Sequence, residues 1–441
     1  MSIDRRQFIL KTGASLAVGS VMQDLVFTRS ALADPASTLA SPLPAATPIL
    51  VVIQLDGGND ALNTLIPVAV SGATSPYRAG RPGIAITSVT SSRPYSKPPS
   101  GVYLPPALDL DGHYGLHGNL VWLANRWHAR HDVAIVQGIG EDVMKERSHF
   151  AAIAFRAAGA FYGMNLASGW LGRYNDVHNQ GQPAASISLR GINPALSGTA
   201  TAVLAVNDVA AADWQVSSSV DSRSVFIADL IGMGSAAVPA SMNKVATAAR
   251  AIQNTNGAII TLKAASQPSL NQGVTPGTLA YQLTQAAMLI TAGVPCQTYT
   301  TSLGGFDTHG NQAYNHALAL GELDAGLQQF FGIIDGSSRA HDVTVLITSE
   351  FGRQVSENAS GGTDHGRAGV AFVIGGGARG GLYGSMPNFG MRDYDGLIPT
   401  VDFRALYATL LNRLGGNVNL TRAVIGLDEA GHDFPDLGIF H

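Results

Sequence analysis

The chain has 441 residues, of which 46% are hydrophobic and only 13% charged, so it carries enough apolar material for a large core. Its net charge of −4 gives no electrostatic reason to expect nucleic acid or an anionic membrane as a partner. The single cysteine, Cys296, excludes an internal disulfide and is expected in the core, because its context GVPCQTY is apolar.

The first 33 residues have the features of an export signal. MSIDRRQFILK contains the pair Arg5-Arg6, an apolar stretch follows, and Ala31-Leu32-Ala33 is typical of a cleavage site. We therefore predict a twin-arginine signal peptide over residues 1–33, the twin-arginine export machinery as a partner, and a periplasmic or secreted protein. The alternative is a chance basic N-terminus. No run of 18 or more apolar residues follows, so no transmembrane segment is expected.

Residues 34–48 are rich in Pro, Ala and Ser, which predicts a flexible lead-in to a single domain over residues 49–441. Within that domain, apolar runs predict buried strands, and longer runs with apolar residues at helical spacing predict helices. In chain order these are strands in 49–55 and 133–140, a helix in 151–160 and one in 278–293, a strand in 295–303, a helix in 320–335, strands in 343–349 and 369–377, and a helix in 401–415.

Strands that alternate with helices favour an α/β fold, here a three-layer sandwich with a mostly parallel central sheet and helices on both faces. Residues 185–275 are rich in Ala, Ser, Gly and Thr and only weakly patterned, so an insertion or cap is predicted there. In sheets of this kind ligands bind beyond the carboxyl ends of the strands.

Three carboxylates are predicted at that edge, because Asp56, Asp307 and Glu350 each follow an apolar strand-like run. Carboxylates packed together repel, and a divalent cation is the simplest compensation. His309 and His365 stand close by in the sequence, and Asp, Glu and His together are the ligands of zinc, manganese or iron. The alternatives are ordinary ones: each Asp is a turn residue or helix cap, Glu350 pairs with Arg353, and Asp364-His365 is a turn with a solvated histidine.

Several motifs, in one order, resemble those of a large family of exported bacterial proteins, the domain of unknown function numbered fifteen hundred and one. They span roughly residues 49 to 415 and are LDGGNDALNTLIP, SHF, GWLGRY, GFDTHGNQ, SEFGR, GTDHG and DFRALY. That family is placed in the alkaline phosphatase and sulfatase superfamily, whose members are metal-dependent hydrolases of phosphate or sulfate esters. The resemblance implies an alkaline-phosphatase-like version of the α/β sandwich and an ester of a small molecule or polymer as substrate.

The resemblance also implies roles for particular residues. Ser148 falls where the superfamily has its nucleophile, at the start of a helix. The superfamily commonly has Asp-His where this chain has Glu350-Phe351, so one histidine of the second metal site is missing. Either His149 or Asp364 substitutes for it, or the site holds one metal. The implied ligands of a divalent metal (zinc, manganese or calcium) are Asp56, Asp307, His309, Glu350 and His365, with Asp364 and His149 as substitutes.

The chemistry of ester hydrolysis suggests further candidates. A serine hydroxyl is a poor nucleophile at neutral pH, and both a metal ion and a helix N-terminus stabilise its alkoxide. Either a second cation or Arg353 is expected to neutralise the non-bridging oxygens of a phosphoryl or sulfuryl group, and Asn59 to donate a hydrogen bond to them. The alternatives are that Ser148 is only a helix N-cap and that Arg353 forms a surface ion pair.

A second function class also fits the sequence. The missing second-site histidine and the Ala-, Gly- and Ser-rich middle segment are consistent with a non-catalytic periplasmic protein that keeps the phosphatase-like fold for binding or assembly.

Overall fold

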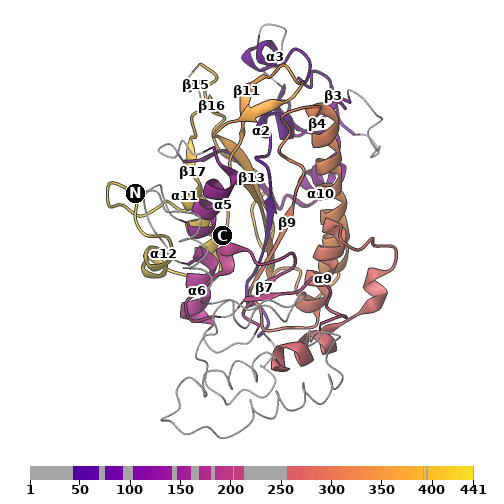
Figure 1. Ribbon diagram of the computed structural model, residues 1–441, viewed down its shortest axis with the longest axis vertical. Helices are drawn as coiled ribbons and strands as arrows, with labels where there is room; N and C mark the ends of the chain where they lie inside the picture. Colours follow the sequence, from indigo (N-terminus) through magenta and orange to yellow (C-terminus); the bar gives the residue numbers. More distant parts are fainter. Residues whose placement is uncertain are drawn as a thin grey trace, which may run out of the picture.

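The computed structural model describes residues 43–68, 75–92, 103–141, 147–159, 168–179, 184–201, 203–212, 256–390, 392–393 and 396–440. A central β-sheet lies between two layers of helices (Figure 1). The predicted fold class is confirmed: an α/β sandwich whose sheet is mostly parallel and covered by helices on both faces. The predicted signal peptide (1–33) and most of the lead-in (34–48) lie outside the described residues.

The central sheet has nine strands within the described residues. In spatial order they are β14 (Gly381–Gly384), β6 (Val133–Gly140), β13 (Gly369–Gly375), β10 (Val343–Ser349), β1 (Ile49–Leu55), β9 (Thr298–Leu303), β7 (Ser186–Ser188) and β8 (Val203–Ala205), while β17 (Val401–Asp402) also pairs with β6. Because β7 and β8 extend this sheet, the start of the segment 185–275 belongs to the main domain and not to an insertion or cap. Residues 213–255 of that predicted insertion lie outside the described residues.

Side-chain alternation along β1 builds a core on each face of the sheet. Ile49, Val51 and Ile53 pack against the helices of one layer, and Leu50 and Val52 against those of the other. The first layer contains α4 (Val121–Arg130), α9 (Leu279–Thr291) and α10 (Gln312–Ile334). The second contains α5 (His149–Ala158), α6 (Trp170–His178), α11 (Phe403–Arg413) and α12 (Val418–Ile425), on the opposite side of the sheet in Figure 1. Cys296 is buried in the first core, as predicted.

The remaining elements are short and gather mainly above one end of the sheet (Figure 1). They are α2 (Ala61–Thr64), α3 (Pro76–Gly80), η3 (Pro194–Leu196) and η4 (Pro268–Asn271), the sheet of β2 (Leu65–Pro67), β3 (Val89–Thr90), β4 (Ala107–Asp109) and β5 (Tyr114–Leu116), and the pairs β11 (Arg353–Glu357) with β12 (Thr363–His365) and β15 (Arg392–Asp393) with β16 (Gly396–Leu397). Within the described ranges, no helix is both long and apolar enough to cross a membrane.

The direction of the strands decides which loops meet. Strands β1, β9 and β10 run parallel, and β6 runs in the same direction because β13 is antiparallel to both β6 and β10. The segments that follow β1, β6, β9 and β10 therefore all begin at one edge of the sheet. The antiparallel β13 starts at that same edge, so the whole segment 350–368 between β10 and β13 stays there.

A buried ion pair anchors the segment after β1 at this edge. The guanidinium of Arg81 donates to both oxygens of Asp60, and both side chains are fully buried. Asp60 also caps α2 by accepting from the Leu62 N–H. Arg81 further donates to the carbonyls of Gln354 and Val355 on β11, so the pair joins two segments that are far apart in the sequence.

Replacing Arg81 with methionine leaves a buried carboxylate without its partner, and we expect the free energy of unfolding to fall by about 3–5 kcal/mol. Denaturant titration measures the change. Arg78→Met is the matched control, since Arg78 lies exposed in the neighbouring helix α3. Equal stability of the two variants would contradict the assignment.

A second buried charge lies at the end of β6. Neither carboxylate oxygen of Glu141 has a hydrogen-bond partner, and the Arg404 guanidinium is 3.8 Å away. Burial raises the pKa of Glu141 to about 7, against a usual value of 4.5. The folded protein thus binds a proton at Glu141 more tightly than the unfolded chain, and this contribution to stability is lost as the pH rises from 4.5 through 7.

Glu141→Gln removes this titration. We expect the variant to gain stability relative to the wild-type protein as the pH rises, so that the difference in free energy of unfolding is larger at pH 8.5 than at pH 5. Chemical denaturation at both pH values tests the sign. A difference that shrinks as the pH rises would mean that ionised Glu141 is stabilised by its arginine neighbours.

Candidate metal centre

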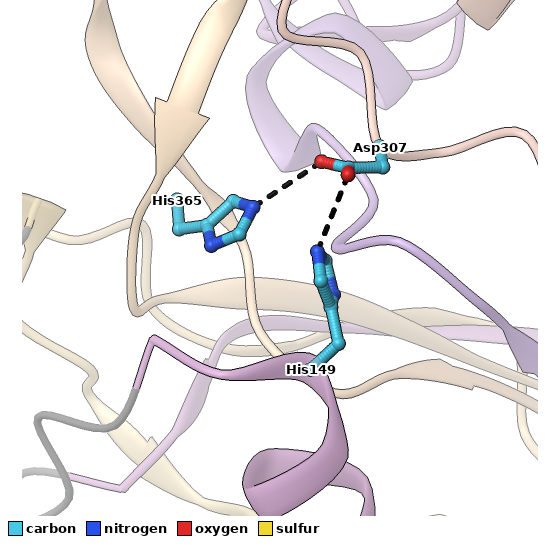
Figure 2. A group of neighbouring side chains, drawn as sticks. All are labelled: His149, Asp307 and His365. Carbon is cyan, nitrogen blue, oxygen red and sulfur yellow. Dashed lines mark hydrogen bonds and ion pairs between the residues drawn. The ribbon is translucent and has the colours of Figure 1, made fainter.

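Side chains from three separate segments converge at the edge of the sheet described above (Figure 2). Asp307 lies in the loop after β9, His149 is the first residue of α5, and His365 ends β12. Each offers a ligand atom, and these three atoms all lie within 4.8 Å of one another. Three of the seven predicted metal ligands therefore form one cluster.

A third histidine adjoins this cluster. His309 Nε2 lies 3.1 Å from Asp307 Oδ1 and 2.9 Å from His365 Nε2, and His365 Nε2 itself lies 3.2 Å from the same oxygen. His149 Nε2 is 3.5 Å from Asp307 Oδ2 and, although buried, makes no hydrogen bond. Neighbouring ligand atoms of a tetrahedral zinc ion are about 3.3 Å apart, so these separations fit the shell of one metal ion.

The three imidazoles share one orientation. In each, Nδ1 faces a hydrogen-bond acceptor, which favours the tautomer with the proton on Nδ1 and the Nε2 lone pair directed toward the cluster. The acceptors are Glu350 Oε1 for His149 (2.7 Å), the Arg147 carbonyl for His365 (2.8 Å) and Asp364 Oδ1 for His309 (3.0 Å).

This orientation creates a need for positive charge. If the protons of His309 and His365 are on Nδ1, their Nε2 lone pairs face each other across 2.9 Å and repel. Either a proton makes one ring an imidazolium, or a cation accepts both lone pairs. A divalent metal ion serves both histidines and the adjacent carboxylate at once, which makes it the better match to the donor set.

The protonation states suit a metal. Burial alone would raise the pKa of Asp307, but the hydrogen bond and the positive charge of Arg353 outweigh it and lower that pKa to about 2. Burial lowers the pKa of His365, which keeps this imidazole neutral at neutral pH. The cluster thus presents an ionised carboxylate and a neutral imidazole, the forms that bind a metal ion.

Arg353 has a different role from the one predicted. Its side chain is completely buried on β11, so it does not reach a substrate. It donates to the carbonyls of Gly57, Gly58, Phe306 and Thr363 and, at 2.5 Å, to Asp307 Oδ1. Arg353 thus positions Asp307, and neither the predicted substrate contact nor the alternative of a surface ion pair describes it.

Glu350 lies behind the cluster and is not one of its ligand groups. Its side chain has no exposed surface. Oε1 accepts from the Gly57 N–H and faces His149 Nδ1, while Oε2 accepts from Gln54 and Ser349. These four contacts use the lone pairs of both oxygens. Glu350 therefore orients His149, which takes the ligand position predicted for the carboxylate.

Two other predicted residues are not among the ligand groups of this cluster. Asp56 shares the face of β1 that carries Val52 and Gln54, because side chains alternate along a strand, and it lines a cavity on that face. Asn59 is buried, and its Oδ1 accepts from Thr64 and lies 2.9 Å from His316 Nε2, so it does not face a substrate. The structure thus does not bring Asp56 and Asn59 into the site.

Ser148 and Asp364 lie beside the cluster. Ser148 is exposed and directly precedes His149 at the N-cap position of α5, where its side chain makes no capping hydrogen bond. Asp364 is exposed and accepts from Asn358 as well as orienting His309, so it acts on a candidate ligand from outside the cluster.

The carbonyl of Arg147, which orients His365, was not predicted, because every residue carries such a group and the sequence does not distinguish this one. Arg156, which donates to the Glu350 carbonyl, was not predicted either. A signal for Arg156 was present: a single arginine within the apolar helix AAIAFRAAG.

Comparison with known proteins supplies a family. Residues 135–433 match the family model described as a protein of unknown function, DUF1501. The chain belongs to this family. The predicted family membership is therefore confirmed, and no curated protein sequence matches this DUF1501 chain.

Among solved structures, this DUF1501 protein is similar to the lipoteichoic acid synthase LtaP from Listeria monocytogenes, with 8% identity, a TM-score of 0.33, and coverage of 89% of this chain and 76% of the other. A protein in the alkaline phosphatase superfamily from Vibrio parahaemolyticus shows 10% identity, a TM-score of 0.33, and coverage of 95% and 78%. Similarity at this level identifies no activity for this chain.

The orientation of His149 by Glu350 can be tested through zinc affinity. Glu350→Gln removes the charge that favours the Nδ1 proton, and we expect zinc to bind about ten- to a hundredfold more weakly. Competition with a chromophoric chelator measures the affinity. Asp428→Asn is the matched control, because Asp428 pairs with the exposed His432 outside the site. Unchanged affinity in Glu350→Gln would rule out this role.

Proposed function

We propose that this protein is an exported, metal-dependent hydrolase of phosphate or sulfate esters. The observation that carries the proposal is the convergence of His149, Asp307 and His365, with His309 beside them, at the edge of the sheet where ligands bind in α/β folds. Three imidazoles and one carboxylate favour zinc or another transition metal, whereas calcium prefers oxygen ligands alone.

The residues that would hold the ion are His149, Asp307, His365 and His309. When bound, a divalent ion supplies Lewis acidity, which stabilises negative charge that develops on an ester oxygen. The chain itself supplies the geometry: Arg353 holds Asp307, and Glu350 and Asp364 orient two of the imidazoles. With side chains held in advance, little reorganisation is needed when charge develops.

Ser148 is the candidate nucleophile. Its exposed hydroxyl stands at the N-terminus of the ten-residue helix α5, one residue before His149. The free N–H groups at a helix N-terminus favour negative charge, so the serine alkoxide and the anionic group of the substrate are both stabilised there. Attack by the Ser148 oxygen would form a covalent serine ester and release the alcohol, and water would then hydrolyse that ester.

Export rests on the arginine pair in MSIDRRQFILK, and we propose a periplasmic or secreted location reached through the twin-arginine machinery. A folded export route suits a protein that acquires its metal before it leaves the cytoplasm.

A non-catalytic binding protein is the second candidate function. The observation that favours it is Phe351, whose ring lies 5.0 Å from that of His149 and 4.8 Å from that of His365, centroid to centroid. The resemblance places a second-site histidine at Phe351, so an apolar ring takes the place of a ligand. A cluster built around one ion is consistent with either function.

An ester panel separates the two candidates. We expect the zinc-loaded protein to hydrolyse an aryl phosphate or aryl sulfate, Asp307→Ala to lose both metal and activity, and Ser148→Ala to keep the metal but lose at least a hundredfold in turnover. Metal content by mass spectrometry and release of the aryl alcohol are the measurements, with Asp428→Asn as control. A protein that binds zinc but hydrolyses none of the esters supports the binding function, and one that binds no metal contradicts the metal-dependent hydrolase.

A further inference from the structure

A second concave site lies beside the candidate metal centre, in the interior of the fold. It is a cavity of about 160 Å³ between the central sheet and the helical layer that contains α5 and α6. A water molecule takes up about 30 Å³ in the liquid, so the cavity has room for roughly five waters or one small organic molecule.

The walls of this cavity change character with depth. Along β1 the lining runs from Val52 through Gln54 to Asp56, which follows the carboxyl end of the strand. Leu346 on β10 is the register partner of Val52 and also lines the cavity. The inner part is thus apolar, and the part nearest the edge of the sheet is polar and charged. This gradient suits a ligand with one apolar and one polar end.

Arg156 provides an unused donor in the wall. The residue is only 4% exposed, its Nε donates to the Glu350 carbonyl, and its Nη1 is buried without any hydrogen-bond partner. A guanidinium does not lose its charge in proteins, and an unmade hydrogen bond to a buried charged group is costly. Asp402, Glu141 and Glu350 act on Arg156 through space from outside the cavity lining. Nη1 nonetheless lacks an acceptor within the protein, and Arg156 lines the cavity.

Arg190 adds a second positive charge at the outer part. It is exposed, lines the same cavity, and donates through Nη1 to the Ser302 carbonyl. Asp56 is the carboxylate in the lining and interacts electrostatically with Arg190. Two guanidinium groups against one carboxylate leave the lining with a net positive charge, which favours an anion over a neutral or cationic ligand.

We propose that this cavity binds a small organic oxoanion, with its charged group between Arg156 and Arg190 and its apolar part against Val52 and Leu346. Carboxylates and phosphonates share the chemistry that a guanidinium recognises, since both present paired oxygens to its N–H groups. The proposal concerns a site distinct from the candidate metal centre and does not depend on metal binding or hydrolysis.

Calorimetric titration of the full-length, metal-free protein tests the proposal. The probes are benzoate, phenylphosphonate and the neutral benzyl alcohol, at constant ionic strength and pH 7.5. We expect one molecule of at least one anion to bind per chain and benzyl alcohol not to bind. Preference for benzoate would identify a carboxylate ligand, and preference for phenylphosphonate a phosphorus oxoanion.

Variants locate the binding. We expect Arg156→Gln and Arg190→Gln each to weaken anion binding about tenfold or more, the effect of losing a charge-assisted hydrogen bond. Arg130→Gln, which changes an exposed arginine outside the cavity, should leave the affinity unchanged. Because Arg156 is buried, its variant needs a folding check by circular dichroism, and the exposed Arg190 gives the decisive result if Arg156→Gln does not fold.

Asp307→Asn separates this cavity from the metal centre. Anion binding that persists in Asp307→Asn supports the cavity, even if the protein proves to have no metal and no hydrolase activity. Three results would overturn the proposal: no binding of either anion, equal affinity in Arg190→Gln and the wild-type protein, or loss of binding in a folded Asp307→Asn variant.

Discussion

The buried guanidinium of Arg353 is the interaction on which the candidate site depends. It lies where the segments after β1, β9 and β10 meet, and it donates to backbone carbonyls of all three and to the Asp307 carboxylate. A charged group in the interior needs acceptors on every side, and the loops supply them only when they are folded together. The solvation of one cation therefore ties loop geometry to the position of the central carboxylate.

Around that carboxylate, the histidines are held by acceptors that lie outside the cluster. Glu350 and Asp364 are carboxylates that lie outside the ligand cluster. Each faces the Nδ1 atom of one imidazole, Glu350 that of His149 and Asp364 that of His309, and so favours the proton on that nitrogen. The charge that favours Nδ1–H on His149 is itself buried and fully hydrogen-bonded, so it is not available for other partners. The arrangement separates the groups that orient from the groups that bind.

Much of the fold could be predicted from the sequence, because long apolar runs such as Ile49–Leu55 and Val343–Ser349 have few alternatives to a buried strand. The antiparallel direction of β13 could not be predicted, because an apolar run does not show in which direction the strand runs in the sheet. The same limit explains the site. Residue types and strand ends placed Asp307, His309 and His365 at one edge. The sequence could not show that His149 is a ligand group and that Glu350 only orients it, because that depends on how deeply each side chain is buried.

Asp56 and Arg353 are two residues whose side-chain direction could not be predicted from the sequence. Asp56 follows a strand just as Asp307 follows one, yet strand alternation turns it toward the α5 layer and its cavity. Arg353 looks like a surface charge in SEFGRQ, and only the carbonyls that surround it show that it belongs to the interior. In both cases the chemistry of the side chain was available from the sequence and its direction was not.

The reversal of β13 has a consequence for how this architecture can vary. A parallel strand after β10 would require a crossover to the far end of the sheet and back, and every residue in that crossover would be constrained by packing. Because β13 is antiparallel, residues 350–368 instead form a connection whose two ends lie at the same edge of the sheet, at the end of β10 and the start of β13. Its tip, between β11 and β12, packs against the segment after β9, because the carbonyls of Ser360 and Gly361 accept from the N–H groups of Asn311 and Gln312. A change in the length of that tip would therefore also shift the start of α10 and the loop that carries His309.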